Sequence, residues 1–397
     1  MTPARPRTLG RVASLAGLAT VGDETTSRAR LASGRREQFL AQSQLSPDAA
    51  RAGRGASRFG RSAGDCGAPR GPYAALDLGT NNCRLLVARP TAEGFRVIDA
   101  FSRVVRLGEG VSHTGRLGEA AIERTLEALR VCRDKMTARG VTRARLIATE
   151  ACRAAENGGV FLERVRERVG LELEIVDRET EATLAVAGCS ELADREAASI
   201  LLFDIGGGSS EIIWLDRVRD GVGLRRLQSW ESLRLGVVSL AEKFGGDEVT
   251  PESFAAMTHF VAEALAPFAA RVANRERCGR FHLLGTSGTV TTIAGVHLNL
   301  PRYDRRAVDG LWLTSAEVDA TVSRLRAMSY AERAANACIG VERADLVLAG
   351  CAILEAIRGH FPAQRIRIAD RGLREGMLMQ MMRADRVWPR ARRGALV

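Results

Sequence analysis

Over most of the chain, short apolar runs of strand length alternate with longer segments of helical period. The strand-like runs of the first half are "YAALDL" (73–78), "CRLLVA" (83–88), "FRVIDAFSRVV" (95–105), "ARLIAT" (144–149) and "LELEIV" (171–176). Its helices are expected at 119–138, where Ile122, Leu126, Leu129 and Met136 fall on one face, and at 160–170. This order of elements predicts an α/β domain.

The second half repeats that order. Its strand-like runs are "SILLFDI" (199–205), "EIIWL" (211–215), a third near 225–233, "RFHLL" (280–284) and "IRIA" (366–369). Long helical patterns occupy 251–275 and 344–358. The chain is therefore predicted to contain two copies of one α/β unit.

The duplication extends to individual residues. Without gaps, "LDLGTNNCRLLV" (76–87) aligns on "FDIGGGSSEIIW" (203–214). The alignment places Asp77 on Asp204, Gly79 on Gly206, Asn82 on Ser209 and Arg84 on Glu211. Each copy has a strand that ends in Asp, then a glycine-containing turn, then a second strand. Such a turn joins antiparallel strands, and its glycine lets backbone N–H groups point at an anion.

Four regions are expected. Residues 1–71 are rich in Arg, Ala and Gly, show no sustained periodicity and are predicted to be a disordered basic extension. The first domain is predicted at 72–194 and the second at 195–385, followed by a flexible basic tail at 386–397.

Charge adds little to this picture. The 397 residues carry a net charge of +11, but residues 1–71 supply +7 of it. The only lysines are Lys135 and Lys243, so the excess is an arginine bias without an aromatic and basic platform. A specific nucleic-acid partner is therefore not expected.

The cysteines and the apolar runs indicate a cytoplasmic protein. The 8 cysteines form no CxxC pair and are predicted to be reduced, mostly buried thiols. No run approaches the ~20 apolar residues that span a bilayer, so no membrane partner is expected. The N-terminal segment has too few large hydrophobic residues for a signal peptide, and it is interpreted as an extension or as a start site placed too early.

Three glycine-rich turns are candidates for phosphate binding. Two are the aligned hairpins, which would form a pincer if they faced each other across a cleft. The third lies in "LLGTSGTVTTIAG" (283–295), where Ser287 and Gly288 would stand at a helix N-terminus. Each turn alone could be an ordinary hairpin or an N-cap, but the paired Asp-x-Gly patterns favour phosphate.

A family resemblance becomes specific at this point. The chain contains, in order, "ALDLGTNNCRLLVAR", "RLGEGV", "ATEACRAAENGGVFLERV", "DRETEATLAVAG", "LLFDIGGGSSEII", "LGTSGTVTTIAG", "ERADLVLAGCAILEA" and "DRGLREG". This order resembles the exopolyphosphatase/guanosine pentaphosphate phosphohydrolase family over about residues 73–380. The resemblance implies duplicated domains of the actin, sugar kinase and Hsp70 ATPase-like (ribonuclease H-like) fold, with the active site in an interdomain cleft.

The resemblance also implies a reaction and its residues. Such enzymes release terminal phosphate from inorganic polyphosphate or from guanosine pentaphosphate with a divalent metal, here expected to be Mg²⁺. By position, the catalytic carboxylate is Glu181, with Glu179 as the alternative if the register slips, and the active-site arginine is Arg153. The metal ligands are expected to be Asp204 and Glu211, helped by Asp77.

The turns and nearby arginines complete the expected phosphate site. Its residues are Gly79, Thr80, Asn81, Asn82, Arg84, Gly207, Gly208, Ser209, Ser287 and Gly288, with Arg106 as a further candidate. Thr183 and Cys83 depart from the family pattern, which has Arg and an aromatic residue there, and both leave substrate preference open. The partner is a polyanionic phosphate chain, and a homodimer is what the resemblance suggests.

The alternatives are a guanosine pentaphosphate phosphohydrolase, an ATP-dependent phosphotransferase of the same fold, and a sensor that binds polyphosphate or alarmone without hydrolysing it. The carboxylates argue against the sensor.

Overall fold

The computed structural model describes residues 71–217, 225–273 and 280–388. All of them belong to one compact unit, Ser57–Val397. The predicted extension at 1–71 lies outside the described residues except for Gly71, and residues 389–397 of the predicted tail lie outside them too. The described part of that tail includes Trp388, whose indole N–H donates a hydrogen bond to the carbonyl of Thr91 at 2.7 Å.

The first domain is built on a sheet of order β3-β2-β1-β4-β5. Its strands are β1 (Tyr73–Leu78), β2 (Asn82–Thr91), β3 (Gly94–Val104), β4 (Arg143–Ala148) and β5 (Glu174–Ile175). The β1, β2 and β3 strands form an antiparallel meander, whereas β4 and β5 run parallel to β1.

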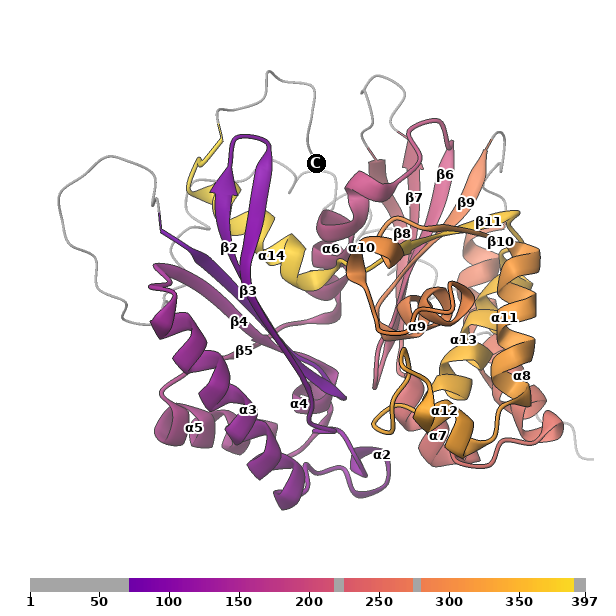
Figure 1. Ribbon diagram of the computed structural model, residues 1–397, viewed down its shortest axis with the longest axis horizontal. Helices are drawn as coiled ribbons and strands as arrows, with labels where there is room; N and C mark the ends of the chain where they lie inside the picture. Colours follow the sequence, from indigo (N-terminus) through magenta and orange to yellow (C-terminus); the bar gives the residue numbers. More distant parts are fainter. Residues whose placement is uncertain (1–70, 218–224, 274–279, 389–397) are drawn as a thin grey trace, which may run out of the picture. The chain divides into compact units, whose positions relative to one another are not determined.

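The second domain repeats this arrangement in a sheet of order β10-β11-β9-β6-β7-β8 (Figure 1). Its strands are β6 (Ser199–Ile205), β7 (Ser210–Arg217), β8 (Arg225–Leu233), β9 (Phe281–Thr286), β10 (Trp312–Thr314) and β11 (Arg365–Ala369). Again three strands form an antiparallel meander, and β9 and β11 lie parallel to β6. The α/β class and the repeat of one unit are confirmed.

The two aligned turns join equivalent strands with equivalent geometry. The N–H of Gly79 donates to the carbonyl of Asn82 at 2.9 Å, and that of Gly206 donates to Ser209 at 2.9 Å. Cross-strand neighbours also correspond, since Asp77 pairs with Arg84 and Asp204 pairs with Glu211. The gap-free alignment of the sequence therefore holds at the level of register.

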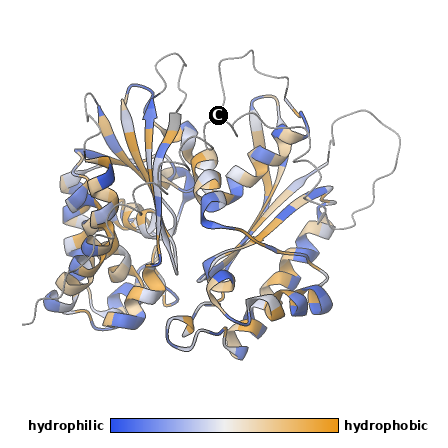
Figure 2. Ribbon diagram, turned by 180° about the vertical axis from the view of Figure 1, so that it is seen from behind, coloured by the Kyte–Doolittle hydropathy of each residue, from blue (hydrophilic) through white to orange (hydrophobic). Residues whose placement is uncertain are grey.

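Helices cover the outer face of each sheet. In the first domain these are α2 (Val111–Thr114), α3 (Glu119–Ala138), α4 (Glu150–Ala154) and α5 (Gly158–Val169). In the second domain they are α7 (Val237–Phe244), α8 (Pro251–Val272), α9 (Gly288–His297), α10 (Arg305–Val308), α11 (Ser315–Ala327), α12 (Tyr330–Ala335) and α13 (Val347–His360). Hydrophobic residues run through the strands of both sheets, while hydrophilic ones are prominent on the outer helices (Figure 2).

Two helices cover the inner faces, and each covers the sheet of the other half of the sequence. The last helix, α14 (Leu373–Ala384), packs on the first sheet, where Met377 and Met381 contact the cluster around Tyr73. Conversely α6 (Arg178–Cys189), which continues into the 3₁₀ turn η2 (Ser190–Leu192), packs Ala182 and Ala185 against the second sheet. Figure 1 shows α14 beside β2 despite its place at the end of the chain.

The backbones of α6 and α14 are close because both helices carry glycine where they meet. A Cβ on Gly188 would lie 2.0 Å from the carbonyl oxygen of Gly372, and one on Gly376 would lie 2.1 Å from that of Leu184. Any larger residue at either position would force the helices apart. The sequence-based domain limits stay predictions, but α14 belongs to the core of the first sheet.

Two expectations about compartment can be compared with the described residues. Their six cysteines are buried and form no disulfides, and Cys83 and Cys132 place their sulfur atoms 3.9 Å apart. In the same part of the chain, no helix has the length and apolarity that crossing a membrane requires.

Candidate functional site

A cavity of about 100 Å³ lies where the two hairpin turns meet. It is lined by Asp77, Gly79, Thr80, Asn81, Asn82, Arg84, Thr149, Glu150, Glu181, Asp204, Gly206, Gly207, Gly208, Ser209, Glu211, Thr286, Ser287, Asp370, Arg371, Gly372, Leu373 and Arg374. The lining is almost wholly polar or glycine, and it includes no aromatic side chain. A wall of this kind suits a compact anion better than an apolar ligand.

The carbonyl groups of both turns already accept hydrogen bonds from neighbouring backbone N–H groups. In the first turn, Asn81 O accepts from the N–H of Val105 at 2.9 Å, and Thr80 O accepts from Gly108 at 2.9 Å. In the second turn, Gly206 O and Gly207 O accept from the start of α7, at 3.0 and 2.8 Å. The segment after the third strand of each meander thus orients each turn.

Several N–H groups of the same turns, in contrast, have no hydrogen-bond acceptor among the described residues. Those of Thr80, Asn81, Gly207 and Gly208 donate to no protein acceptor in the part of the chain that the structure describes. An N–H group that is withheld from protein partners carries a free-energy cost unless a ligand or water accepts from it. Turns whose acceptors are satisfied and whose donors are free form a concavity for an anion.

The glycines of the second turn allow the two turns to touch. A Cβ on Gly207 would lie 2.9 Å from the Cβ of Thr80 and 3.1 Å from the backbone nitrogen of Asn81. A Cβ on Gly208 would lie 2.7 Å from the hydroxyl oxygen of Thr80. A side chain at Gly207 would both push the turns apart and cover a free N–H group.

Glu181 is placed at the cavity by the start of α6. Asp177 caps that helix by accepting from the N–H of Thr180 at 2.7 Å, and Glu181 follows within the first turn. The side chain is 3% exposed. Burial raises the pKa of Glu181 to about 7, and the nearby charges of Asp77 and Asp204 raise it further, while Arg153 opposes the shift.

Arg153 lies against Glu181 and is not itself among the residues that line the cavity. Its Nη2 donates to Glu181 at 3.1 Å, its Nε donates to Glu150 at 3.0 Å and its Nη1 donates to the carbonyl of Val176 at 2.6 Å. Glu150 in turn accepts from Arg178 at 2.8 and 2.9 Å. A partly buried chain of alternating charge, Arg178–Glu150–Arg153–Glu181, therefore fixes the carboxylate of Glu181.

Two further carboxyl groups face each other across the second hairpin. Burial raises the pKa of Asp204 to about 6 and that of Glu211 to about 8, and repulsion from neighbouring carboxylates adds to both shifts. Glu211 accepts hydrogen bonds from the hydroxyls of Ser209 at 2.8 Å and Ser232 at 2.9 Å. Without a cation, ionising both side chains would bring two negative charges close together, so protonation is favoured.

Asp77 occupies the equivalent place in the first hairpin but has different neighbours. Burial raises the pKa of Asp77, and the positive charges of Arg84 and Arg374 oppose this. The first-hairpin side of the cavity is thus richer in arginine, and the second-hairpin side is richer in carboxylate.

The residues present fit a divalent cation only in part. The described residues contain no group of three or more His, Cys, Asp or Glu side chains arranged to hold a metal. Mg²⁺ does not require one, because it often binds one or two carboxylates, waters and substrate phosphate. Asp204 and Glu211 offer such carboxylates, and the buried amide oxygens of Asn81 and Asn82 have no hydrogen-bond partner.

The third glycine-rich turn also reaches the cavity. Ser287, which lines it, has φ 80° and precedes α9. A positive φ is rare for serine. The hydroxyl of Ser287 lowers the pKa of Asp204 against the effect of burial, so the two side chains lie close together. Gly288 lies beside Arg84, whose Nη2 would be 3.9 Å from a Cβ at that position.

The cavity brings together most of the residues expected from the sequence. Arg153 and Gly288 are set back from it. Arg106 lies elsewhere: its two Nη atoms donate to the carboxylate of Asp345 at 2.8 and 2.9 Å, linking the two domains. Glu179, the alternative to Glu181, is exposed.

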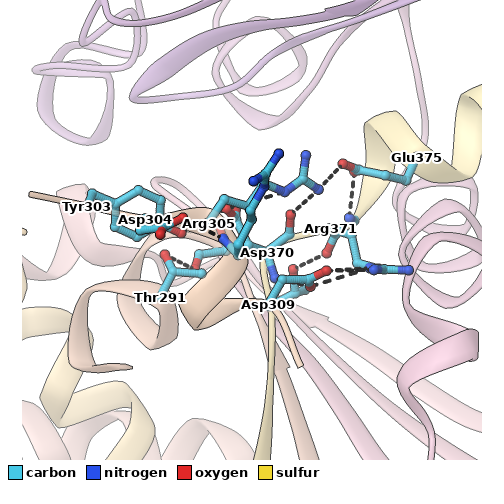
Figure 3. A network of polar contacts seen from close by, with 12 residues as sticks. Thr291, Tyr303, Asp304, Arg305, Asp309, Asp370, Arg371 and Glu375 are labelled. Atoms are coloured by element: carbon cyan, nitrogen blue, oxygen red, sulfur yellow. Dashed lines mark hydrogen bonds and ion pairs between the residues drawn. The ribbon is translucent and has the colours of Figure 1, made fainter. Parts of the chain in front are cut away.

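Sequence reasoning missed several lining residues. Glu150 follows β4, Asp370, Arg371 and Gly372 form the connection from β11 to α14, and Arg374 lies in the first turn of α14. Glu150 lies in the motif "ATEACRAAENGGVFLERV" and the other four lie in "DRGLREG". Both motifs contribute to the resemblance, but no candidate site residue comes from the second, and only Arg153 comes from the first. Figure 3 shows Arg305 and Asp309 converging on this connection.

The fold and the site together define a two-domain α/β protein of the actin-like ATPase fold, with a polar cavity where the equivalent hairpin turns of the two domains meet. Comparison with known proteins is specific. The model of the Ppx/GppA phosphatase family matches residues 86–385. The chain belongs to this family, and it is a phosphoanhydride hydrolase.

Individual relatives carry names from the same family. The chain is 28% identical over 322 residues to "Exopolyphosphatase 2" of Mycobacterium tuberculosis, covering 78% of this chain and 98% of that protein. It is 28% identical over 322 residues to "Guanosine-5'-triphosphate,3'-diphosphate pyrophosphatase" of Photobacterium profundum, where 78% of this chain covers 59% of the relative. The crystal structure of an Aquifex aeolicus Ppx/GppA family member matches with TM-score 0.64 and 28% identity, over 79% of this chain and 98% of that one.

Proposed function

We propose that this protein is a metal-dependent exopolyphosphatase, which releases terminal orthophosphate from inorganic polyphosphate. The observation that carries the proposal is the pair of touching turns that line one small cavity beside a buried glutamate, with their carbonyls bonded and their N–H groups without a protein acceptor among the described residues. Donors fixed in advance around a phosphoryl group stabilise the charge that develops in phosphoryl transfer.

In the proposed reaction, water attacks the terminal phosphorus and the bond to the bridging oxygen breaks. The Glu181 carboxylate accepts the proton of the attacking water, which its raised pKa near neutrality suits. Arg153 holds that carboxylate in place. Asp204 and Glu211 would hold Mg²⁺ or another divalent cation, which supplies positive charge to the phosphate oxygens.

The character of the cavity favours an inorganic chain over a nucleotide. Its volume of about 100 Å³ is small for a site that encloses a nucleoside, and no aromatic side chain in its lining could stack on a base. Guanosine pentaphosphate is the alternative substrate, since the Photobacterium profundum relative carries the corresponding name.

The test is release of orthophosphate from long-chain polyphosphate, guanosine pentaphosphate and ATP at matched concentrations with Mg²⁺. We expect polyphosphate to give the highest kcat/KM, and chelation with EDTA to abolish turnover. Preference for guanosine pentaphosphate would support the alternative. Turnover of ATP alone with a phosphoryl acceptor, or binding without phosphate release, would overturn the proposal.

A further inference from the structure

The connection that runs from the end of β11 into the first turn of α14, residues 370–375, borders the cavity and is dense in charge. Asp370 accepts from the hydroxyl of Tyr303 at 2.8 Å (Figure 3). Arg371 donates to Asp309 at 2.6 Å and to Glu191 at 3.1 Å. These contacts tie the first half of the connection to the second domain.

Both carboxylate oxygens of Glu375 also accept hydrogen bonds. One of its oxygens accepts from Arg305 at 2.7 Å and the other accepts from the N–H of Gly372 at 2.9 Å. Arg305 also donates to the carbonyl of Asp370, so it joins both ends of the connection (Figure 3). The backbone that carries residue 374 is thereby held in place.

Arg374 is the exception. Within this fully described connection it is the one charged side chain without a hydrogen bond or ion pair. It lines the cavity in the first turn of the 12-residue helix α14. Burial lowers the pKa of Arg374, and the positive charge of Arg84 acts in the same direction. The negative charges of Glu375, Asp77 and Asp370 oppose this shift. Glu375 and Asp370 are hydrogen-bonded to other groups, and Asp77, which lines the same cavity, forms no hydrogen bond or ion pair with Arg374.

Arg374 is half-buried, and partial burial of an unpartnered guanidinium carries a free-energy cost, because hydrogen bonds do not replace the lost hydration. A fixed backbone that aims such a group into a cavity of free N–H donors is explained by an anionic ligand. A guanidinium matches two oxygens of one phosphate, and the adjacent helix N-terminus adds favourable potential. We propose that Arg374 is a substrate-binding residue that contacts phosphate oxygens in the cleft. This proposal rests on the function proposed above.

The test compares Arg374→Met and Arg374→Lys with Arg383→Met, which removes the same charge from an exposed position on the same helix. With polyphosphate as substrate, Arg374→Met should raise KM by about 10- to 100-fold, and Lys should recover part of the loss. Arg383→Met should leave KM unchanged. In a Glu181→Gln background, calorimetric titration with tripolyphosphate should show the same order of affinities.

Thermal unfolding separates binding from structure. Since the guanidinium of Arg374 is half-buried and has no hydrogen-bond or ion-pair partner without ligand, Arg374→Met should leave the Tm of the ligand-free protein unchanged or raise it, while added tripolyphosphate should stabilise the variant less than it stabilises the wild type. Unchanged KM and titration would overturn the inference, as would a fall in Tm with kcat reduced and KM unaltered. If wild type itself releases no phosphate from polyphosphate, the proposed function fails instead.

Discussion

Arg153 donates a hydrogen bond to the buried carboxylate of Glu181, over 3.1 Å and across 28 positions of sequence. The contact joins the short helix after β4 to the first turn of α6. It gives the proposed base a fixed direction and a neighbouring positive charge. Because Glu150 shares the same guanidinium, the positive charge available to Glu181 is divided between two acids.

Replacing Glu181 by Gln should abolish most of the turnover. The amide keeps the shape of the side chain but accepts no proton at neutral pH, so kcat should fall by about 100- to 10,000-fold. Steady-state phosphate release measures this. Glu179→Gln, an exposed change two residues away, is the matched control, and equal losses in the two variants would remove Glu181 from its role.

The rate should depend on pH through Glu181. Only the ionised carboxylate accepts a proton, and the pKa of Glu181 is raised to about 7, so kcat/KM should fall as pH drops below neutrality. In Glu150→Gln the positive charge of Arg153 would act on Glu181 alone and lower its pKa. The fall of kcat/KM on the acid side of the pH profile should then occur at a pH lower by roughly one unit. Glu167→Gln, exposed on α5, should leave the profile in place.

The metal-free protein should lose stability as pH rises. Folding raises the pKa of Asp204 to about 6 and that of Glu211 to about 8, so the folded state binds these protons more tightly than the unfolded state does. Their contribution is complete below the unfolded pKa values of roughly 4 and is lost through the folded values. In EDTA, Tm should therefore be higher at pH 5 than at pH 8.5.

Two comparisons check this assignment. Glu211→Gln removes one of the titrating groups and should flatten the dependence of Tm on pH. Mg²⁺ should restore Tm most at high pH, where the carboxylates are ionised. A Tm that rises steadily from pH 5 to pH 8.5 without metal would show that other groups control stability.

Gly207→Ala should impair the site without unfolding the domains. The added methyl would meet Thr80 and the N–H of Asn81 across the cleft, so we expect at least a tenfold loss of kcat/KM, the order that one misplaced anion donor costs. Gly159→Ala in α5 meets nothing within 4 Å and serves as the control, with unchanged turnover. Wild-type kinetics in Gly207→Ala would contradict the close approach of the turns.

Arg106 and Asp345 should be energetically coupled. They form a two-point ion pair between the domains, and both side chains are partly buried. In a double-mutant cycle with Arg106→Met and Asp345→Asn, unfolding free energies should show a coupling of about 1 kcal/mol. Strictly additive losses would mean that the pair contributes nothing beyond its separate members.

Local sequence information sufficed for the hairpins and the strands that flank them. The alternation and the Asp-x-Gly turns are encoded within about a dozen neighbouring residues, and β1, β6 and β8 begin and end where expected. The run at 171–176 gave only a two-residue strand, because Leu171 turns into the core beneath α5. The three-residue β10 is too short to show a period.

The candidate site residues were predictable from two sources. The duplication indicates the turn residues, whereas Glu181 follows only from the family resemblance. Glu150 and Arg374 were not predicted, because their significance lies in their partners: Glu150 bridges two arginines that are distant in sequence, and Arg374 stands among paired charges without one. Such relationships exist only after the chain has folded.

The exchange of α6 and α14 has a consequence for the history of the duplication. Each sheet is covered on its inner face by a helix encoded in the opposite half of the sequence. If the chain were divided between the halves, each fragment would lose the helix that covers one apolar face of its sheet. We therefore expect that neither half folds alone, although the repeat suggests an ancestor of one unit that did. The two copies of the unit therefore depend on each other to complete their cores, and a pair of glycines permits the close approach of the two exchanged helices.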